Sequence, residues 1–316
     1  MINMYYMDHG LYVFRPDHIR ADYEDMKDMG CDAVTLSVLE QFHHGHKAIQ
    51  NHCRLAHAAG LKIHVIPARF GGMFAGAPKT ASGFAINNPD LLVEDANGDR
   101  HGVCCVENPG VRDFFAERLQ SLIGDYEFDG VVLDEPKGTD IVCHCRHCCE
   151  AYGKVSHRTR QQSIVNFLGF LCDQIKSVRD SVEISLFAMP HDSGEFLAQL
   201  AALPNLDYIG IDGPVCDQET APGAPIVKAS LFESAPAALV TASEHGKKSL
   251  LVLESFGVPA WAYDAFAAGL DRALAYSPDQ WIFFYYPHNT EDPDRLMALT
   301  ESAIRRISGR SGFEAG

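Results

Sequence analysis

The feature that most constrains the fold of this chain is a regular alternation of short apolar runs with longer amphipathic stretches. Each run is continuously apolar, as expected for a strand that is buried on both faces of a parallel sheet. Because the two patterns alternate along the whole chain, we expect parallel strands joined by helices. The expected strands are Met4–Met7, Ala33–Val38, Lys62–Pro67, Gly130–Asp134, Glu183–Ala188, Tyr208–Asp212, Ser249–Glu254 and Trp281–Tyr286.

The amphipathic stretches have the spacing of helices that bury one face. Proline opens several of them, as after Asn108, and glycine follows two of them at Gly30 and Gly60, where a left-handed residue commonly closes a helix. Eight strands in alternation with eight helices predict an α/β fold, a (β/α)8 TIM barrel that forms a single domain over residues 1–310, with a flexible tail over 311–316. The expected helices include Pro16–Met29, His46–Ala59, Pro109–Ile123, Gln161–Val178, Ala262–Ala275 and Pro293–Ile307.

The competing architecture is a doubly wound open sheet, which usually carries a glycine-rich phosphate turn after its first strand. The segment Asp8–His9–Gly10 is not such a turn, and the two glycines between Phe70 and Phe74 do not match the GxGxxG pattern. The barrel is therefore the favoured fold.

Length and charge limit the classes of function. The 316 residues fit a single barrel of this type. The formal charge of −16 argues against a nucleic-acid surface, which would need a basic stripe. The first residues do not join a basic segment to an apolar one, and no apolar run approaches the roughly 20 residues that a membrane span needs. We expect a cytoplasmic protein without a nucleic-acid or membrane partner, and a homo-oligomer remains open.

Ionisable and aromatic side chains gather where the expected strands end. In a barrel, the loops that follow the strands form the active site at one rim. Burying so many ionisable groups in an apolar core would be unfavourable. We therefore interpret them as the lining of a polar pocket. The expected substrate-binding residues are Asp8, His9, Glu40, Arg69, Asp134, Lys137, His191, Asp212, Trp261, Tyr286 and His288.

Two glutamates, Glu135 and Glu254, lie at the ends of the fourth and seventh expected strands. Glycoside cleavage needs two carboxyl groups, one to protonate the leaving oxygen and one to attack the sugar or activate water. Each glutamate alone could instead cap a helix or form an ion pair. We interpret the two together as a catalytic pair, and we expect Trp261 and Tyr286 to stack on sugar rings.

A cysteine-rich segment follows the fourth expected strand. Cys143, Cys145 and Cys148 form a Cys-x-Cys-x-x-Cys run, which can wrap one zinc ion at about 2.3 Å from each sulfur. The fourth ligand would be Cys104 or, alternatively, Cys105, from the loop after the third strand. A reducing cytosol favours a metal over a disulfide, and a site closed by four sulfurs would be structural. Other candidate ligands are His144, His147 and Cys149.

These residues carry a resemblance to a group of enzymes. Asp134–Glu135–Pro136 and Leu253–Glu254–Ser255 resemble the strand-four and strand-seven ends of the large clan of retaining glycoside hydrolases. The cysteine loop is similar to the zinc site of the family 42 β-galactosidases and of related uncharacterised glycosidase-like barrels. The resemblance implies a glycoside hydrolase that acts on a carbohydrate, with Glu135 as acid/base and Glu254 as nucleophile. It also implies a zinc ion held by Cys143, Cys145, Cys148 and one of Cys104 or Cys105.

Three alternatives remain. Asp134 and Asp212 could form the catalytic pair, as nucleophile and acid, in the strand-four and strand-six arrangement of other sugar-cleaving barrels. Asp134 stands where the clan has asparagine, which motivates a barrel that binds carbohydrate without catalysis. The histidines of His43–His46 suggest metal-dependent hydrolysis, but His9 stands alone where such barrels show His-x-His.

Overall fold

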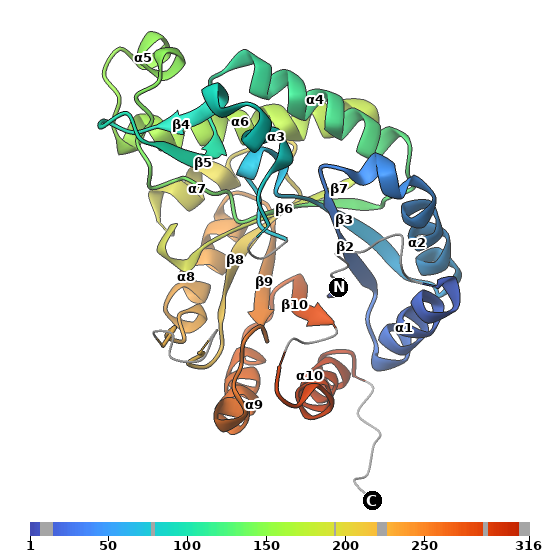
Figure 1. Ribbon diagram of the computed structural model, residues 1–316. Coiled ribbons are helices and arrows are strands. Elements are labelled where there is room, and N and C mark those ends of the chain that lie inside the picture. The colour runs from blue at the N-terminus through green and yellow to red at the C-terminus, as the bar shows by residue number, and fades with distance from the viewer. Residues whose placement is uncertain (7–14, 77–79, 193, 220–225, 287–289, 310–316) are drawn as a thin grey trace, which may run out of the picture.

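The computed structural model describes residues 1–6, 15–76, 80–192, 194–219, 226–286 and 290–309, and it confirms the predicted barrel. The strands of the ring lie side by side in Figure 1. They pair in parallel, and β10 pairs with β1 to close the ring. The predicted tail over 311–316 lies outside the described residues. Around the ring, the strands are β1 (Ile2–Tyr6), β2 (Ala33–Leu39), β3 (Lys62–Ala68), β6 (Gly130–Asp134), β7 (Glu183–Ala188), β8 (Tyr208–Pro214), β9 (Lys248–Glu254) and β10 (Gln280–Tyr286).

Helices surround the ring of strands (Figure 1). In α1, for example, Ile19, Tyr23 and Met26 are buried at the spacing of one helix face. None of the helices in the described ranges is long and apolar enough to cross a membrane. The outer helices are α1 (Pro16–Met29), α2 (His46–Ala58), α4 (Pro109–Gly124), α6 (His157–Val178), α7 (Glu195–Ala201), α8 (Leu231–Glu244), α9 (Tyr263–Ala273) and α10 (Pro293–Ile307).

The ends of these helices follow local chemistry. Gly30 has a φ of 115° and closes α1 in the left-handed conformation, as predicted. Helix α6 begins four residues before the predicted start at Gln161, because Ser156 caps it. The Ser156 hydroxyl oxygen accepts a hydrogen bond from the backbone N–H of Thr159, and the Thr159 hydroxyl accepts one from the backbone N–H of Ser156.

Two loops on one side of the barrel carry extra elements that were not predicted. The connection from β3 to β6 contains α3 (Gly83–Asn87) and a hairpin of β4 (Leu92–Glu94) and β5 (Arg100–Cys104). The connection from β6 to α6 contains α5 (Arg146–Tyr152), which stands at the edge of the molecule in Figure 1. These elements are too short to show a helix or strand period in the sequence.

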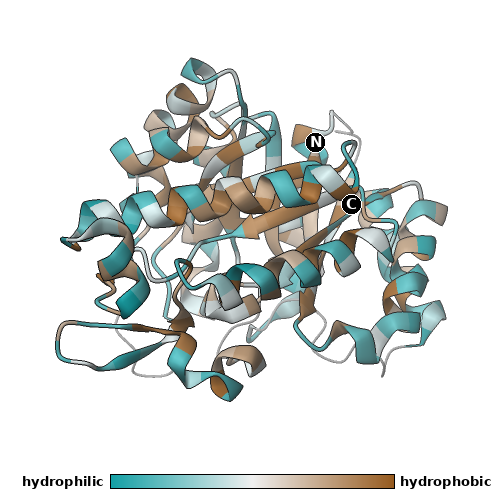
Figure 2. Ribbon diagram, turned by 90° about the horizontal axis from the view of Figure 1, so that it is seen from above, coloured by the Kyte–Doolittle hydropathy of each residue, from teal (hydrophilic) through white to brown (hydrophobic). Residues whose placement is uncertain are grey.

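The apolar core forms two clusters, one inside the ring and one between the ring and the helices. Neighbouring residues on one strand belong to different clusters, as with Ile66 inside and Val65 outside. Both faces of each strand are therefore buried, which explains the continuous apolar runs. Viewed from above, the strands in the middle of the molecule are mostly hydrophobic, whereas the helices carry hydrophilic residues among hydrophobic ones (Figure 2).

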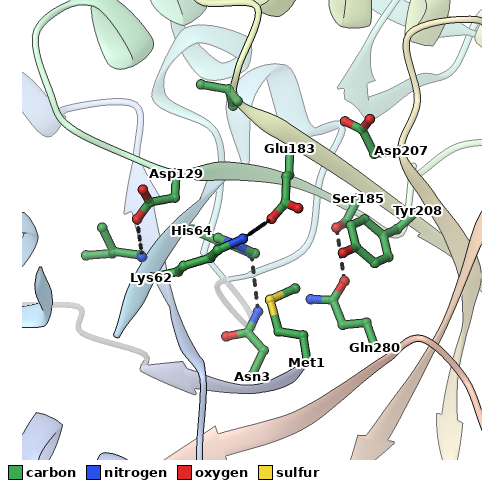
Figure 3. Close-up of polar contacts among 12 residues, drawn as sticks. Met1, Asn3, Lys62, His64, Asp129, Glu183, Ser185, Asp207, Tyr208 and Gln280 are labelled. Atoms are coloured by element: carbon green, nitrogen blue, oxygen red, sulfur yellow. Dashed lines mark hydrogen bonds and ion pairs between the residues drawn. The ribbon is translucent and has the colours of Figure 1, made fainter. Parts of the chain in front are cut away.

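The interior of the ring is polar near the starts of the strands (Figure 3). The Asn3 amide donates a hydrogen bond to the Thr35 hydroxyl at 2.6 Å and lies 3.5 Å from His64 Nδ1. Burial lowers the pKa of His64 to about 4, which keeps the imidazole neutral at physiological pH. Lys62 and Glu183 form an ion pair at 2.9 Å beneath this layer. The catalytic groups predicted from the strand ends lie at the opposite end of the barrel.

Candidate active site

A cavity of about 290 Å³ opens at the carboxyl ends of the barrel strands. This is the rim at which barrel enzymes carry their active sites. Six of the predicted site residues line the cavity, and two aromatic side chains complete its wall. The lining includes Arg69, Asp134, Glu135, Lys137, Asp212, Glu254, Phe256 and Phe284.

Three carboxyl groups converge in this cavity. Glu135 directly follows β6. Asp212 lies two residues before the end of β8, and Glu254 is the last residue of β9. One oxygen from each lies within 4.8 Å of an oxygen of the other two. Glu135 and Asp212 are buried, whereas Glu254 is half-buried. The fold therefore brings together groups that are far apart in the sequence.

The close approach of these carboxyl groups changes their acidity. Burial, followed by the negative charge of Glu135, raises the pKa of Glu254 to about 7. Burial, followed by the charge of Glu254, raises the pKa of Asp212 well above its usual range. Glu135 itself forms an ion pair with Lys137 at 2.5 Å. The protonated forms of Asp212 and Glu254 are therefore favoured relative to those of ordinary surface carboxyl groups.

Two residues of the cavity have a left-handed backbone, which is unfavourable for residues other than glycine. Glu135 has a φ of 42° and Arg69 a φ of 60°. Such conformations cost about 1–3 kcal/mol each and persist where surrounding contacts enforce them. Here the Glu135 N–H donates to the Phe187 carbonyl at 3.1 Å, and the Lys137 N–H donates to the Met73 carbonyl at 2.7 Å. The backbone is thus held in a conformation that places the Glu135 side chain in the cavity.

Arg69 brings a positive group to the same wall. Its Nε donates a hydrogen bond to the carbonyl of Thr80 at 2.8 Å, which fixes the guanidinium near the loop after β3. Burial lowers the pKa of Arg69, and the carboxylates of Asp134 and Glu40 oppose this shift. The cavity can therefore hold polar or negatively charged substituents as well as hydroxyl groups.

Glu40 has a different position from the one predicted. Its carboxylate accepts hydrogen bonds from the backbone N–H of Gly71 at 2.8 Å, the Ser82 hydroxyl at 2.5 Å and the backbone N–H of Phe84 at 2.8 Å. Glu40 thus connects the end of β2 to the loop after β3, and it does not line the cavity of the three carboxyl groups.

The remaining predicted binding residues lie away from this cavity or outside the described residues. His191 is exposed in the short helix η4 (Pro190–Asp192), and Trp261 is 61% exposed in η5 (Ala260–Ala262). The Tyr286 hydroxyl lies 3.3 Å from carboxylate oxygens of both Asp22 and Asp25 in α1, and it can donate its hydrogen bond to either. The residues outside the described ranges are Asp8, His9 and His288.

Sequence reasoning did not select Phe284, although it lines the cavity. Its ring lies 6.1 Å from that of Phe256 between centroids. The signal was available in β10, because Ile282 points into the ring and side chains two residues apart share one face of a strand. The aromatic residue that we expected to stack on sugars at the end of β10 was instead Tyr286, which does not line the cavity.

Four cysteine sulfurs form a second cluster, between the β4–β5 hairpin and α5. Cys105 Sγ lies 3.4 Å from both Cys145 Sγ and Cys148 Sγ, and the four sulfurs of Cys105, Cys143, Cys145 and Cys148 lie within 4.8 Å of one another. Hydrogen bonding with Cys105 lowers the pKa of the Cys143 thiol and raises that of Cys148. All ten cysteines of the chain are free of disulfides.

This cluster suits a tetrahedral metal ion. A zinc ion about 2.3 Å from each sulfur would place the sulfurs roughly 3.8 Å apart, close to the spacing of this cluster. Cys105 is the fourth member, and the preference for Cys104 does not match the geometry. Cys104 packs instead in the apolar core, beside Gly71. Among the described residues, no other candidate group of metal ligands includes His144, His147, Cys149 or the histidines of His43–His46.

No protein-family model matches the chain, and no curated protein matches it. Solved structures do resemble it. A β-galactosidase from the Antarctic haloarchaeon Halorubrum lacusprofundi aligns with a TM-score of 0.68 and 14% identity, over 97% of this chain and 58% of that one. A β-galactosidase from the psychrophilic Marinomonas ef1 aligns with a TM-score of 0.67 and 12% identity, over 98% of this chain and 59% of that one.

An endo-1,4-β-mannanase from Rhizomucor miehei aligns with a TM-score of 0.59 and 11% identity, over 96% of this chain and 94% of that one. The chain therefore spans little more than half the length of the two β-galactosidases and nearly the whole mannanase. At these identities the likeness concerns the fold, which is the barrel that these glycoside hydrolases share.

Proposed function

We propose that the protein is a glycoside hydrolase of the retaining type, in which Glu135 and Glu254 are the catalytic pair. The observation that carries this proposal is the convergence of their carboxyl oxygens within 4.8 Å at the carboxyl ends of the strands. Retaining enzymes have carboxyl groups about 5–5.5 Å apart, whereas inverting enzymes need roughly 6.5–9.5 Å for an intervening water. The spacing therefore supports retention.

The mechanism assigns one task to each glutamate. Glu254 attacks the anomeric carbon while Glu135 protonates the departing oxygen, and a covalent glycosyl-enzyme ester forms. Glu135 then removes a proton from water, and this water displaces Glu254 from the sugar. Asp134, Lys137 and Arg69 bind substituents of the sugar.

The class of substrate is inferred from the shared fold. The three solved structures described above are named as β-galactosidases and a mannanase, so a carbohydrate is the substrate class that we propose. Fold alone does not determine function. The convergence of carboxyl groups at the active-site rim supports the same class independently.

A second assignment of roles has its own support. Glu135 forms an ion pair with Lys137 at 2.5 Å, and the pKa of Glu254 is raised to about 7. A general acid needs a raised pKa, and a nucleophile needs its charge. In this second assignment Glu254 is the acid and Glu135 is the nucleophile.

We also propose that Cys105, Cys143, Cys145 and Cys148 hold one structural zinc ion. Four thiolates leave no open coordination position, so the ion would join the loop after β6 to the end of the β4–β5 hairpin without entering the chemistry. This loop starts at the catalytic Glu135, and the ion would therefore stabilise one wall of the active site.

A panel of nitrophenyl glycosides tests the proposal. We expect hydrolysis of at least one member, and proton NMR should show that the sugar released first keeps the anomeric configuration of the substrate. Glu254→Ala should lose activity on every substrate, and azide should restore it with an inverted product. Glu135→Ala should retain activity on nitrophenyl glycosides, whose leaving group needs little proton assistance.

Other outcomes select the alternatives. The second assignment would be supported if Glu135→Ala were the inactive variant that azide rescues and Glu254→Ala the one that keeps activity on nitrophenyl glycosides. Loss of activity only in Asp134→Ala and Asp212→Ala would support the other pair of carboxylates. Binding of sugars without turnover across the panel would indicate a barrel that binds carbohydrate without catalysis.

A further inference from the structure

A second, larger cavity lies on the same side of the barrel, outside the ring of strands. It has a volume of about 500 Å³ and lies between the loop after β2, helix α3 and the first turns of α4. This volume is within the range of about 300–1,000 Å³ that is typical of ligand sites. We propose that this groove is an accessory site that binds pyranose units of a neutral glycan chain, and this inference rests on the proposed function.

Aromatic rings form one wall of the groove. The rings of Phe84 in α3 and Phe114 in α4 are parallel, 3.8 Å apart between centroids with an interplanar angle of 8°. Both side chains are half-buried, so they present part of their apolar surface to the groove. Such surface suits the C–H face of a sugar ring, which is apolar although the edge of the ring is polar.

Polar groups surround this aromatic wall. The side chains of Gln41, Asn87 and Asp113 line the groove and make no side-chain hydrogen bond to the described residues. Arg118 also lines the groove, and its guanidinium lies 5.8 Å from the Phe114 ring centre. The polar side chains at the groove that make no hydrogen bond within the protein are free to bind a polar ligand.

The chemistry of the groove favours a neutral sugar over other ligands. Carboxylates of Asp113 and Glu117 line it, and the chain carries a formal charge of −16, so phosphate-rich ligands would be repelled. An apolar peptide would leave the amides of Gln41 and Asn87 unpaired. The hydroxyl groups of a sugar can donate hydrogen bonds to the carboxylates and exchange hydrogen bonds with the amides. The apolar face of the same sugar can pack on the aromatic wall.

The groove and the catalytic cavity share a structural connection. Glu40 lines the groove, and its carboxylate binds the backbone N–H of Gly71 in the loop after β3. The same loop supplies Arg69 and Gly76 to the catalytic cavity. A long glycan could therefore use both sites, whereas a small aryl glycoside would use only the catalytic cavity.

The test compares binding of polymers with hydrolysis of a small substrate. Electrophoresis through native gels that contain β-1,4-galactan, β-1,4-mannan or xyloglucan measures binding, and a nitrophenyl glycoside measures catalysis. The variant Asn87→Ala/Asp113→Ala removes two exposed polar side chains and leaves the Phe84–Phe114 pair in place. Gln120→Ala, also exposed on α4 but outside the groove, is the matched control.

We expect at least one polymer to retard the wild type and Gln120→Ala, and the double variant to lose affinity by about tenfold. The kcat/KM of the double variant for the nitrophenyl glycoside should stay within about twofold of wild type. The inference is overturned if no polymer retards the wild type, or if the double variant is retarded equally. It is also overturned if a folded double variant loses aryl-glycoside activity together with binding.

The variant Glu254→Gln separates this inference from the proposed function. It should lose hydrolysis and keep the retardation by the polymer. If the wild type hydrolyses no glycoside but shows retardation that depends on Asn87 and Asp113, the accessory site stands and the proposed hydrolase activity fails.

Discussion

Individual residues in the catalytic cavity are arranged at the expense of stability. Burial of Glu254, followed by the nearby charge of Glu135, raises the pKa of Glu254 to about 7 from a usual value of 4.5. Glu135 adopts a positive φ at the end of a buried strand. Neither feature improves folding, and both are of the kind that gathers at functional sites.

The raised pKa of Glu254 predicts a particular dependence of stability on pH. Because the folded state binds the proton more tightly than the unfolded state, this contribution is fully present below about pH 4.5 and is lost as the pH rises through about 7. The loss amounts to about 3 kcal/mol, at 1.36 kcal/mol per pH unit. Glu254→Gln cannot ionise, so its stability relative to wild type should increase between pH 5 and pH 8.

Denaturant unfolding at the two pH values measures this difference. Glu244→Gln, which removes an exposed carboxylate from the end of α8, is the control and should show little change between them. A stability difference between Glu254→Gln and wild type that is the same at both pH values would show that Glu254 has an ordinary acidity in the folded protein.

At the scale of elements, the loops after β3 and β6 differ most from an ordinary barrel. The hairpin β4–β5 and helix α5 have short elements that could not be predicted from a period of hydrophobic residues. The Cys105 N–H donates to the Leu91 carbonyl at 2.7 Å, and the His144 N–H donates to the Glu94 carbonyl at 2.6 Å. These backbone contacts place the two cysteine-bearing segments side by side, and the proposed metal would connect them.

Substitution of two adjacent cysteines tests this arrangement. Cys105→Ser should remove the bound zinc and lower the melting temperature, because binding of a structural metal contributes folding free energy. Cys104→Ser should keep one zinc per chain, since the Cys104 sulfur does not belong to the four-sulfur cluster. Elemental analysis together with thermal unfolding measures both effects. Stoichiometric zinc in Cys105→Ser, or none in the wild type, would contradict the proposed metal site.

At the scale of the whole molecule, the barrel was predictable because its strands are buried on both faces. The strands Gly130–Asp134 and Glu183–Ala188 have the predicted bounds. The first strand was predicted at Met4–Met7 but spans Ile2–Tyr6. Its start depends on pairing with β10, where Ile2 lies opposite Trp281, and local hydrophobicity does not contain this information.

The candidate site was predictable where strand ends determine it and not where loops do. Glu135, Asp212 and Glu254 converge because parallel strands of one barrel end at one rim. Glu40 also follows a strand, yet loop contacts engage its carboxylate. Cys104 and Cys105 are adjacent and both buried, and only the folded hairpin determines that Cys105 joins the thiol cluster.

The most direct test of the central claim is to identify the residue that carries a trapped sugar. Dinitrophenyl 2-deoxy-2-fluoro glycosides of galactose, mannose and fucose slow the second step of a retaining mechanism more than the first, so the covalent ester accumulates. We predict that one of them adds a single fluorosugar to the protein and that peptide mapping by mass spectrometry locates it on Glu254. An ester on Glu135 would exchange the two roles and keep the pair. An ester on Asp134 or Asp212, or turnover of glycosides with inversion and no trapped ester, would contradict the account.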